Sequence, residues 1–230
     1  RRPAPVSRAG LPAVVRFGGW RAMQQVVRPT TLNAARWLVL LAAGSTAVGE
    51  LEAARVFVAP ALLLVQGVAS YLFASYAAAQ RDPVSTLLAR ADRGAAVMLT
   101  GCTLLALAAA WAAPTFGHLL TGDGFRLSVA AVLGWGVYAA SCAAVLPYGS
   151  LAAVLGAPAR VFVLRLADSA LALLLTAVAL LVRDLSFAWV PWLLSGGSFV
   201  GGYLCRRLLL VPWAGRGADR PAVRVGSGRP

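Results

Sequence analysis

The sequence has 230 residues, of which 60% are hydrophobic and 13% are charged, and its mean hydropathy is +0.75. A composition this apolar excludes a disordered chain, and three cysteines are too few for a small disulfide scaffold. The formal net charge of +13 is typical of nucleic-acid binding, but here the basic residues separate apolar runs instead of gathering on a soluble domain. The composition therefore predicts an integral membrane protein.

Six apolar runs are long enough to cross a bilayer core, which takes roughly 20 helical residues. Their ranges, in chain order, are 31–49, 56–79, 95–113, 127–147, 161–182 and 185–205. Their continuous apolar character does not fit the alternating strands of a membrane barrel. We therefore predict an all-α fold, a polytopic membrane protein with a six-helix transmembrane bundle.

Two polar segments flank the predicted bundle of residues 31–211. Residues 1–30 form a basic cytoplasmic lead-in, in which residues 13–28 fit either a short helix lying in the membrane interface or a plain linker. Residues 212–230 contain little apolar surface, so we predict a disordered basic cytoplasmic tail. The chain begins with arginine instead of methionine, and we expect it to be a fragment.

The arginines are distributed unevenly between the two sides of the predicted bundle. All 21 basic residues are arginine, as is typical of a GC-rich bacterial coding sequence, and only Arg55, Arg126 and Arg183 fall on the side opposite the two termini. Cytoplasmic segments of membrane proteins retain positive charge. We therefore predict a multi-pass protein of the bacterial cytoplasmic membrane with both termini in the cytoplasm.

Ionisable residues inside a membrane span are costly unless they face protein or water, so they are the candidates for function. Arg36 follows Asn33 by three residues near the start of the first predicted span, which places both on one helix face. Arg36 is either an anchor whose guanidinium reaches the lipid headgroups or, with Asn33, part of a cavity.

Arg165 and Asp168 are three residues apart in the fifth predicted span and share a helix face. They form either a local ion pair that stabilises the helix end or part of a cavity in which Asp168 exchanges a proton. The sequence does not distinguish the two, because burial decides the protonation of the carboxylate.

Residues 49–55 are predicted to form a short acidic turn on the outer side, containing Glu50, Glu52 and Arg55. An ion pair between Glu52 and Arg55 in an exposed turn contributes little stability. Pro60 follows in the next span, where a proline is tolerated near a helix start and bends the helix at greater depth.

The sequence contains no motif of a known catalytic or cofactor site. Cys102, Cys142 and Cys205 lie inside spans without metal-binding spacing, and His118 has no neighbouring carboxylate cluster. We predict no enzyme activity, no cofactor and no metal site. The GxxxG motif of residues 197–201 is interpreted as helix packing.

The segment Gly49-Glu50-Leu51-Glu52-Ala53-Ala54-Arg55-Val56-Phe57-Val58-Ala59-Pro60, followed by Gly67, resembles a pattern in bacterial polysaccharide-export flippases. These belong to the MATE-like multidrug/oligosaccharidyl-lipid/polysaccharide superfamily. The six spans, the basic lead-in and the loop at residues 155–160 are similar to the carboxy-terminal half of such a protein, over residues 14–211. Members of the family have two six-helix bundles facing a central cavity, whereas this chain has one.

The resemblance implies a membrane transporter half that flips a lipid-linked oligosaccharide or polysaccharide precursor by alternating access. It implies a cationic cavity for the diphosphate, with Asn33, Arg36, Arg165 and Asp168 as candidates, and no cofactor. The expected partners are the lipid-linked sugar, membrane lipid, and a missing amino-terminal half or a second copy, and no nucleic acid. The alternatives are a non-transporting membrane scaffold of polysaccharide or cell-wall assembly and a drug exporter of the same superfamily.

Overall fold

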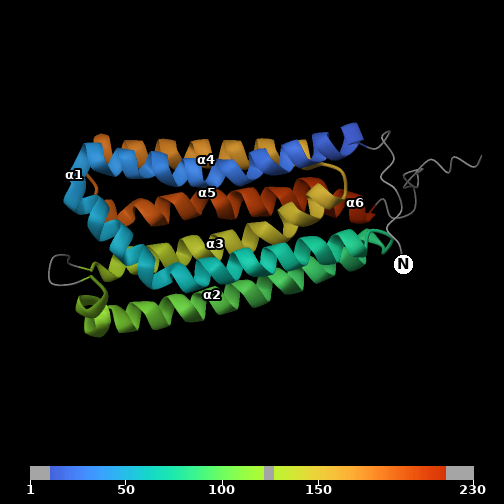
Figure 1. Ribbon diagram of the computed structural model, residues 1–230. Helices are drawn as coiled ribbons and strands as arrows, with labels where there is room; N and C mark the ends of the chain where they lie inside the picture. The colour runs from blue at the N-terminus through green and yellow to red at the C-terminus, as the bar shows by residue number, and fades with distance from the viewer. Residues whose placement is uncertain (1–10, 122–126, 216–230) are drawn as a thin grey trace, which may run out of the picture.

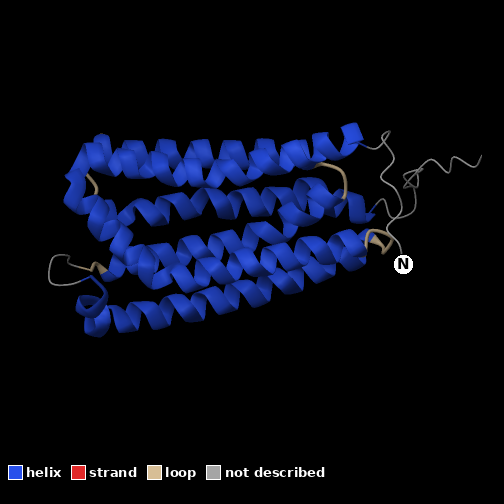
Figure 2. Ribbon diagram, viewed as in Figure 1, coloured by secondary structure: helices blue, strands red, loops and turns tan. Residues whose placement is uncertain are grey.

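The computed structural model describes residues 11–121 and 127–215. Within these ranges the chain is helical apart from short turns, and no strand is present (Figure 2). The elements are α1 (Leu11–Ala78), α2 (Val84–Thr121), α3 (Val129–Val154), α4 (Pro158–Leu181), the 3₁₀ turn η2 (Phe187–Trp189), α5 (Val190–Leu204), the π-helical segment η3 (Cys205–Leu210) and α6 (Val211–Gly215). The predicted all-α fold is confirmed.

Four helices are long and apolar enough to cross a membrane, judged by length and composition over the described residues. They are residues 18–78 of α1, residues 84–117 of α2, α3 and α4. The helices lie lengthwise beside one another (Figure 1). This arrangement is compatible with a membrane protein.

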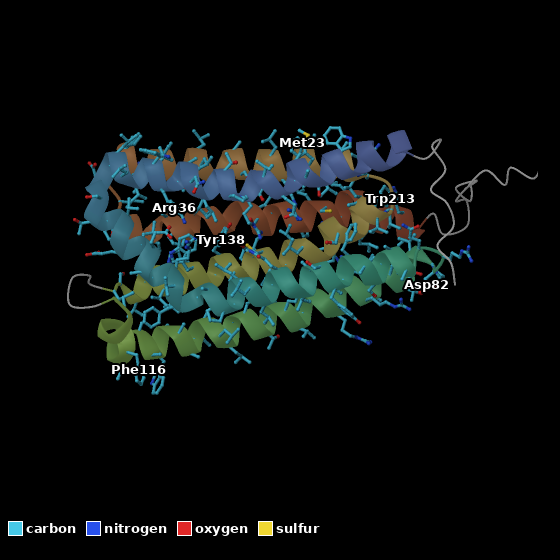
Figure 3. All side chains as sticks on the ribbon, in the orientation of Figure 1. Met23, Arg36, Asp82, Phe116, Tyr138 and Trp213 are labelled. Carbon is cyan, nitrogen blue, oxygen red and sulfur yellow. The ribbon has the colours of Figure 1, made fainter. Side chains whose placement is uncertain are left out.

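The long helix α1 changes direction at Gly44, where φ is +82° and ψ is 178°. This backbone conformation is essentially restricted to glycine. In Figure 1 the arm before Gly44 runs along the bundle, and the arm after Gly44 returns beside α2. We call the end where α1 reverses the Gly44 end, and the opposite end, with the turn between α1 and α2, the Asp82 end (Figure 3).

The chain reverses earlier than at residues 49–55, where the sequence predicted a turn. These residues are helical, because Glu, Leu, Ala and Arg all favour helix and because Arg55 and Glu52 form an i,i+3 ion pair of 2.7 Å. The predicted turn is therefore wrong. Residues 13–28 also belong to α1, instead of forming a separate interfacial helix or a linker.

The helix α3 is the most buried part of the bundle and packs against α1, α2, α4 and α5. The surrounding helices direct large apolar side chains outward: Leu41, Trp111 and Leu174 are 76%, 79% and 61% exposed. Exposed apolar surface on several helices is unfavourable in water and favourable against lipid. The surface of the bundle therefore fits a lipid environment.

The buried apolar side chains form two separate clusters. The larger one, the Gly44-end cluster, draws on α1 to α5 and includes Val39, Leu51, Val132, Leu180 and Leu194. The smaller one, the Asp82-end cluster, includes Tyr76, Leu87, Leu151, Leu209 and Leu210. Among the apolar side chains packed around the two clusters, Leu72 contacts both, and polar side chains gather beside α3 at the level between them.

The helix α5 is short, but its helical backbone continues into η3 and α6. The junction residues Cys205 and Val211 both have right-handed helical φ and ψ angles. The π-helical segment η3 widens one turn of this path, a feature that is rare and frequently found at functional sites. Residues 190–215 therefore form one continuous helical rod with a local bulge.

Candidate functional site

A polar pocket lies between α1, α3, α4 and α5, at the level where the two apolar clusters separate. Its polar lining includes Gln24, Arg28, Tyr138, Arg165, Asp168 and Ser198. Asp168 lies about ten residues into α4, which corresponds to roughly 15 Å along the helix axis, or half of a bilayer core. We call this site the central pocket.

The central pocket brings two arginines and one carboxylate together. The guanidinium carbon of Arg28 lies 5.8 Å from the centroid of the Tyr138 ring, in cation–π geometry. Asp168 interacts electrostatically with Arg28 and Arg165 and lies beside Ser198. With two guanidinium groups and one carboxylate, the pocket has an excess of positive charge.

Three glycines provide the space for these charged side chains. A Cβ atom at Gly197 would overlap Asp168 Oδ1 and would lie 2.9 Å from the backbone oxygen of Asp168. A Cβ at Gly201 would lie 3.3 Å from Asp168 Oδ2, and one at Gly149 would lie 3.4 Å from Arg165 Nη2. The motif predicted for helix packing therefore lets α5 approach the carboxylate of Asp168.

Two buried oxygen atoms of the central pocket accept no hydrogen bond from the described residues: Gln24 Oε1 and Asp168 Oδ1. Gln24 is only 1% exposed, and its Nε2 donates to the Pro158 carbonyl oxygen over 2.8 Å. A buried acceptor without a donor is destabilising. Both atoms are therefore suited to accept hydrogen bonds from a molecule that enters the pocket.

The structure brings Arg165 and Asp168 together at the central pocket, but it places Asn33 and Arg36 elsewhere. Arg36 lies toward the Gly44 end, whereas Tyr138 lies deeper in the bundle (Figure 3). Neither Arg36 nor Asn33 lines the pocket. Of the four cavity candidates, two therefore belong to this site.

Arg36 instead connects the two arms of α1. Its Nε and Nη2 donate to Glu52 Oε1 and Oε2 over 2.6 Å and 3.1 Å, and its Nη1 donates to Asn33 Oδ1 over 2.9 Å. Glu52 also pairs with Arg55. We call these four residues the arm-to-arm cluster.

The remaining outer-turn candidates, Glu50 and Pro60, also lie in the second arm of α1. Glu50 is half-buried and Pro60 is exposed. Pro60 lies within a continuous helix, since the only non-helical backbone angles of α1 are those of Gly44. Neither residue lines the central pocket.

Sequence reasoning missed Gln24 and Arg28, which were assigned to the basic lead-in. A signal was present: Gln24, Arg28 and Thr31 follow the helical spacing of four and three residues, and all three line the pocket. Side chains at this spacing share one face of a helix. These polar residues therefore belong to the first arm of α1, on the helix face that lines the pocket.

No protein-family model, curated protein or solved structure matches this chain. Among residues 11–121 and 127–215, no three His, Cys, Asp or Glu side chains are grouped so that they could hold a metal ion.

Proposed function

We propose that this chain is the carboxy-terminal half of a MATE-like flippase, which moves a lipid-linked oligosaccharide or polysaccharide precursor across the bacterial cytoplasmic membrane by alternating access. The central pocket is the observation that carries this proposal. Ionisable side chains halfway along an apolar bundle are costly, and they mark substrate or ion pathways. Arginine binds phosphate oxygens with two parallel hydrogen bonds, so Arg28 and Arg165 suit a diphosphate.

In this proposal the two arms of α1, then α2, α3, α4 and the rod of residues 190–215, each cross the membrane once. The Asp82 end faces the cytoplasm. This orientation is supported by the arginines at the Asp82 end, because cytoplasmic segments retain positive charge. They include Arg81, Arg90, Arg160, Arg206 and Arg207.

The polar side chains of the pocket have separate roles in this proposal. Arg28 and Arg165 bind the diphosphate, and Asp168 holds the two guanidinium groups in place before the substrate arrives. Gln24 Oε1 accepts a hydrogen bond from a sugar hydroxyl. Arg36 has a structural role between the arms of α1 and does not contact the substrate.

A non-transporting scaffold subunit is the second candidate, and the size of the pocket favours it. The cavity volume is about 30 Å³, which is room for one or two water molecules. A diphosphate with its sugar does not fit this space. The flippase proposal therefore requires a second conformation in which the helices around the pocket separate.

Binding of a fluorescent polyprenyl diphosphate to the purified chain in detergent tests the proposed function. The substitutions Arg28→Gln and Arg165→Gln should each weaken binding about tenfold, because each removes hydrogen bonds between charged groups. Arg160→Gln, which removes an exposed cation at the start of α4, is the matched control and should leave binding unchanged. Equal binding by all four proteins would contradict the assignment, and no binding by the unmodified chain would favour the scaffold.

Compartment-sensitive reporters test the proposed topology. A reporter fused after Trp213 should signal the cytoplasm, and one inserted after Asp184, in the turn between α4 and η2, should signal the periplasm. The opposite pattern would show that the Asp82 end faces outward. Two signals from the same compartment would show that the rod of residues 190–215 does not cross the membrane.

A further inference from the structure

A polar cluster outside the central pocket connects three elements near the Asp82 end. Arg206 of η3 donates from Nε to Asp92 Oδ1 and from Nη2 to Asp92 Oδ2, both over 2.9 Å. Tyr148 of α3 donates its hydroxyl to Asp92 Oδ1 over 2.8 Å. Asp92 of α2 therefore holds a permanently charged group of η3.

A second, smaller pocket adjoins the central pocket. The two share Val145, Arg165 and Asp168 in their linings, and the smaller one continues to Gly201 and Cys205. Cys205 is the first residue of η3 and directly precedes Arg206. The two adjoining pockets, which we call the path, therefore extend from the central pocket toward the Asp82 end and reach η3 at Cys205.

The Asp82-end cluster borders this path, since Val161 and Cys205 belong both to the cluster and to the lining of the smaller pocket. Leu209 and Leu210 of η3 pack there with Tyr76, Leu87 and Leu151, from α1, α2 and α3. The six-residue segment η3 therefore contributes Cys205 to the lining of the smaller pocket, Arg206 to the contact with Asp92, and Leu209 and Leu210 to the Asp82-end cluster. Movement of this segment would alter all three together.

We propose that Asp92, Tyr148 and Arg206 form a latch that keeps the central pocket closed toward the Asp82 end, and that η3 is the segment that moves when the latch opens. This inference concerns the regulation of the pocket for which we proposed substrate binding, and in that sense it rests on the proposed function. In this structure the latch is closed.

Two features make the latch reversible. Arg206 and Asp92 are partly exposed, with 42% and 37% of their side-chain surfaces accessible, so water can replace their hydrogen bonds. The hydrogen bonds of a π-helical segment join residues five apart instead of four, so returning η3 to α-helix rotates the residues that follow. Opening therefore needs a local change of winding and no unfolding of α5.

A buried tyrosine, Tyr76, lies near the Asp92 carboxylate and belongs to the Asp82-end cluster. Its hydroxyl is buried, interacts electrostatically with Asp92 and Tyr148, and forms no hydrogen bond with the described residues in the closed state.

The native Cys205 reports on the latch. We would replace Cys102→Ala and Cys142→Ala, reconstitute the full chain in lipid vesicles, and measure the labelling rate of Cys205 with a water-soluble maleimide. Cys205 is 3% exposed when the latch is closed, so labelling should be slow. Asp92→Asn or Arg206→Gln should accelerate it about tenfold, as expected from the loss of hydrogen bonds between charged groups.

Asp82→Asn is the matched control, because Asp82 and Arg90 form an exposed ion pair of 3.0 Å at the same end of the bundle. It should leave the labelling rate unchanged. The exchange Asp92→Arg with Arg206→Asp should restore slow labelling, because the pair is re-formed with reversed polarity. Unchanged labelling in both single variants would overturn the latch, and so would acceleration by Asp82→Asn to the same extent.

Loss of folding is distinguished by a second cysteine. Chains that keep only Cys102, which is fully buried in the Gly44-end cluster, should stay unreactive in every latch variant. If Cys102 also becomes reactive in Asp92→Asn or Arg206→Gln, the variant Tyr148→Phe is tested in their place, since it removes one hydrogen bond and no charge. Wild-type labelling of Cys205 in that variant would count against the latch.

The labelling rate of Cys205 tests the latch independently of the substrate, because labelling needs no bound ligand. If latch variants open the path while Arg28→Gln binds the polyprenyl diphosphate normally, the latch stands and the proposed function fails. If Arg28→Gln loses binding while the latch variants label normally, the function stands and the latch fails.

Discussion

The two halves of the bundle are stabilised in different ways. At the Gly44 end, side chains from α1 to α5 form the larger apolar cluster, and Trp135 Nε1 donates to the Leu51 carbonyl oxygen over 3.0 Å in a buried position. At the Asp82 end, the apolar cluster is smaller and a partly exposed ion pair, Asp92 with Arg206, joins α2 to η3. The polar central pocket separates the two halves.

This difference indicates which half moves. Close apolar packing has few alternative arrangements, since separating it exposes surface or leaves cavities. Partly exposed hydrogen bonds exchange with water at a small free-energy cost. We therefore expect opening motions at the Asp82 end, with the Gly44 end acting as the rigid part.

Truncation of one buried leucine in each half gives the largest expected effect. Leu51→Ala at the Gly44 end and Leu151→Ala at the Asp82 end should each lower the free energy of unfolding by about 2–5 kcal/mol, because both side chains are fully buried. Thermal unfolding in detergent measures this loss. Only Leu151→Ala should also accelerate labelling of Cys205. Equal acceleration by both variants would remove the distinction between a rigid and an opening half.

A substitution at Gly44, where α1 reverses, should have the next largest effect on the free energy of unfolding. Gly44→Ala should lower the free energy of unfolding by about 1–3 kcal/mol, because its backbone conformation is strained for any residue with a Cβ atom. Gly67→Ala is the control: it lies in the helical second arm, and a Cβ there meets no atom within 4 Å. The control should unfold at the same or a slightly higher temperature. A tolerated Gly44→Ala would place the reversal of the chain elsewhere.

Substitutions in the arm-to-arm cluster should have the smallest of the three effects on the free energy of unfolding. Arg36→Gln removes the ion pair between the arms of α1, which is about one-third exposed, and should cost about 1 kcal/mol or less. Arg55→Gln removes only a pair within one arm and should cost about half as much. Chemical denaturation of both variants tests this order. A loss of polyprenyl diphosphate binding in Arg36→Gln would reassign Arg36 to the substrate site.

Much of the fold follows from local properties of the sequence. Long apolar runs without alternation specify helices, and helix spacing alone places Arg165 and Asp168 on one face of α4. The connection between α3 and α4, with Pro158 at the start of α4, also lies where the sequence predicted a loop. These features depend on residues a few positions apart.

The position of the first reversal is less accessible to sequence reasoning. Glycine adopts both helical and left-handed backbone conformations, so none of the 23 glycines indicates by itself which one reverses the chain. The acidic segment of residues 49–55 looked like an exposed turn, but its residues are good helix formers. The prediction of a turn was wrong because it was based on the polarity of these residues, whereas backbone conformation decides where the chain reverses.

By itself, the sequence determined that this protein is helical and apolar, and that Arg165 and Asp168 share a helix face, because helix formation depends on neighbours along the chain. Only the tertiary structure decided that Arg36 pairs with Glu52 across the reversal at Gly44 and that Gln24 and Arg28 face the central pocket. These partners are brought together by the packing of separate helices. Such packing depends on the fit of whole surfaces, which the spacing of residues along one helix does not specify.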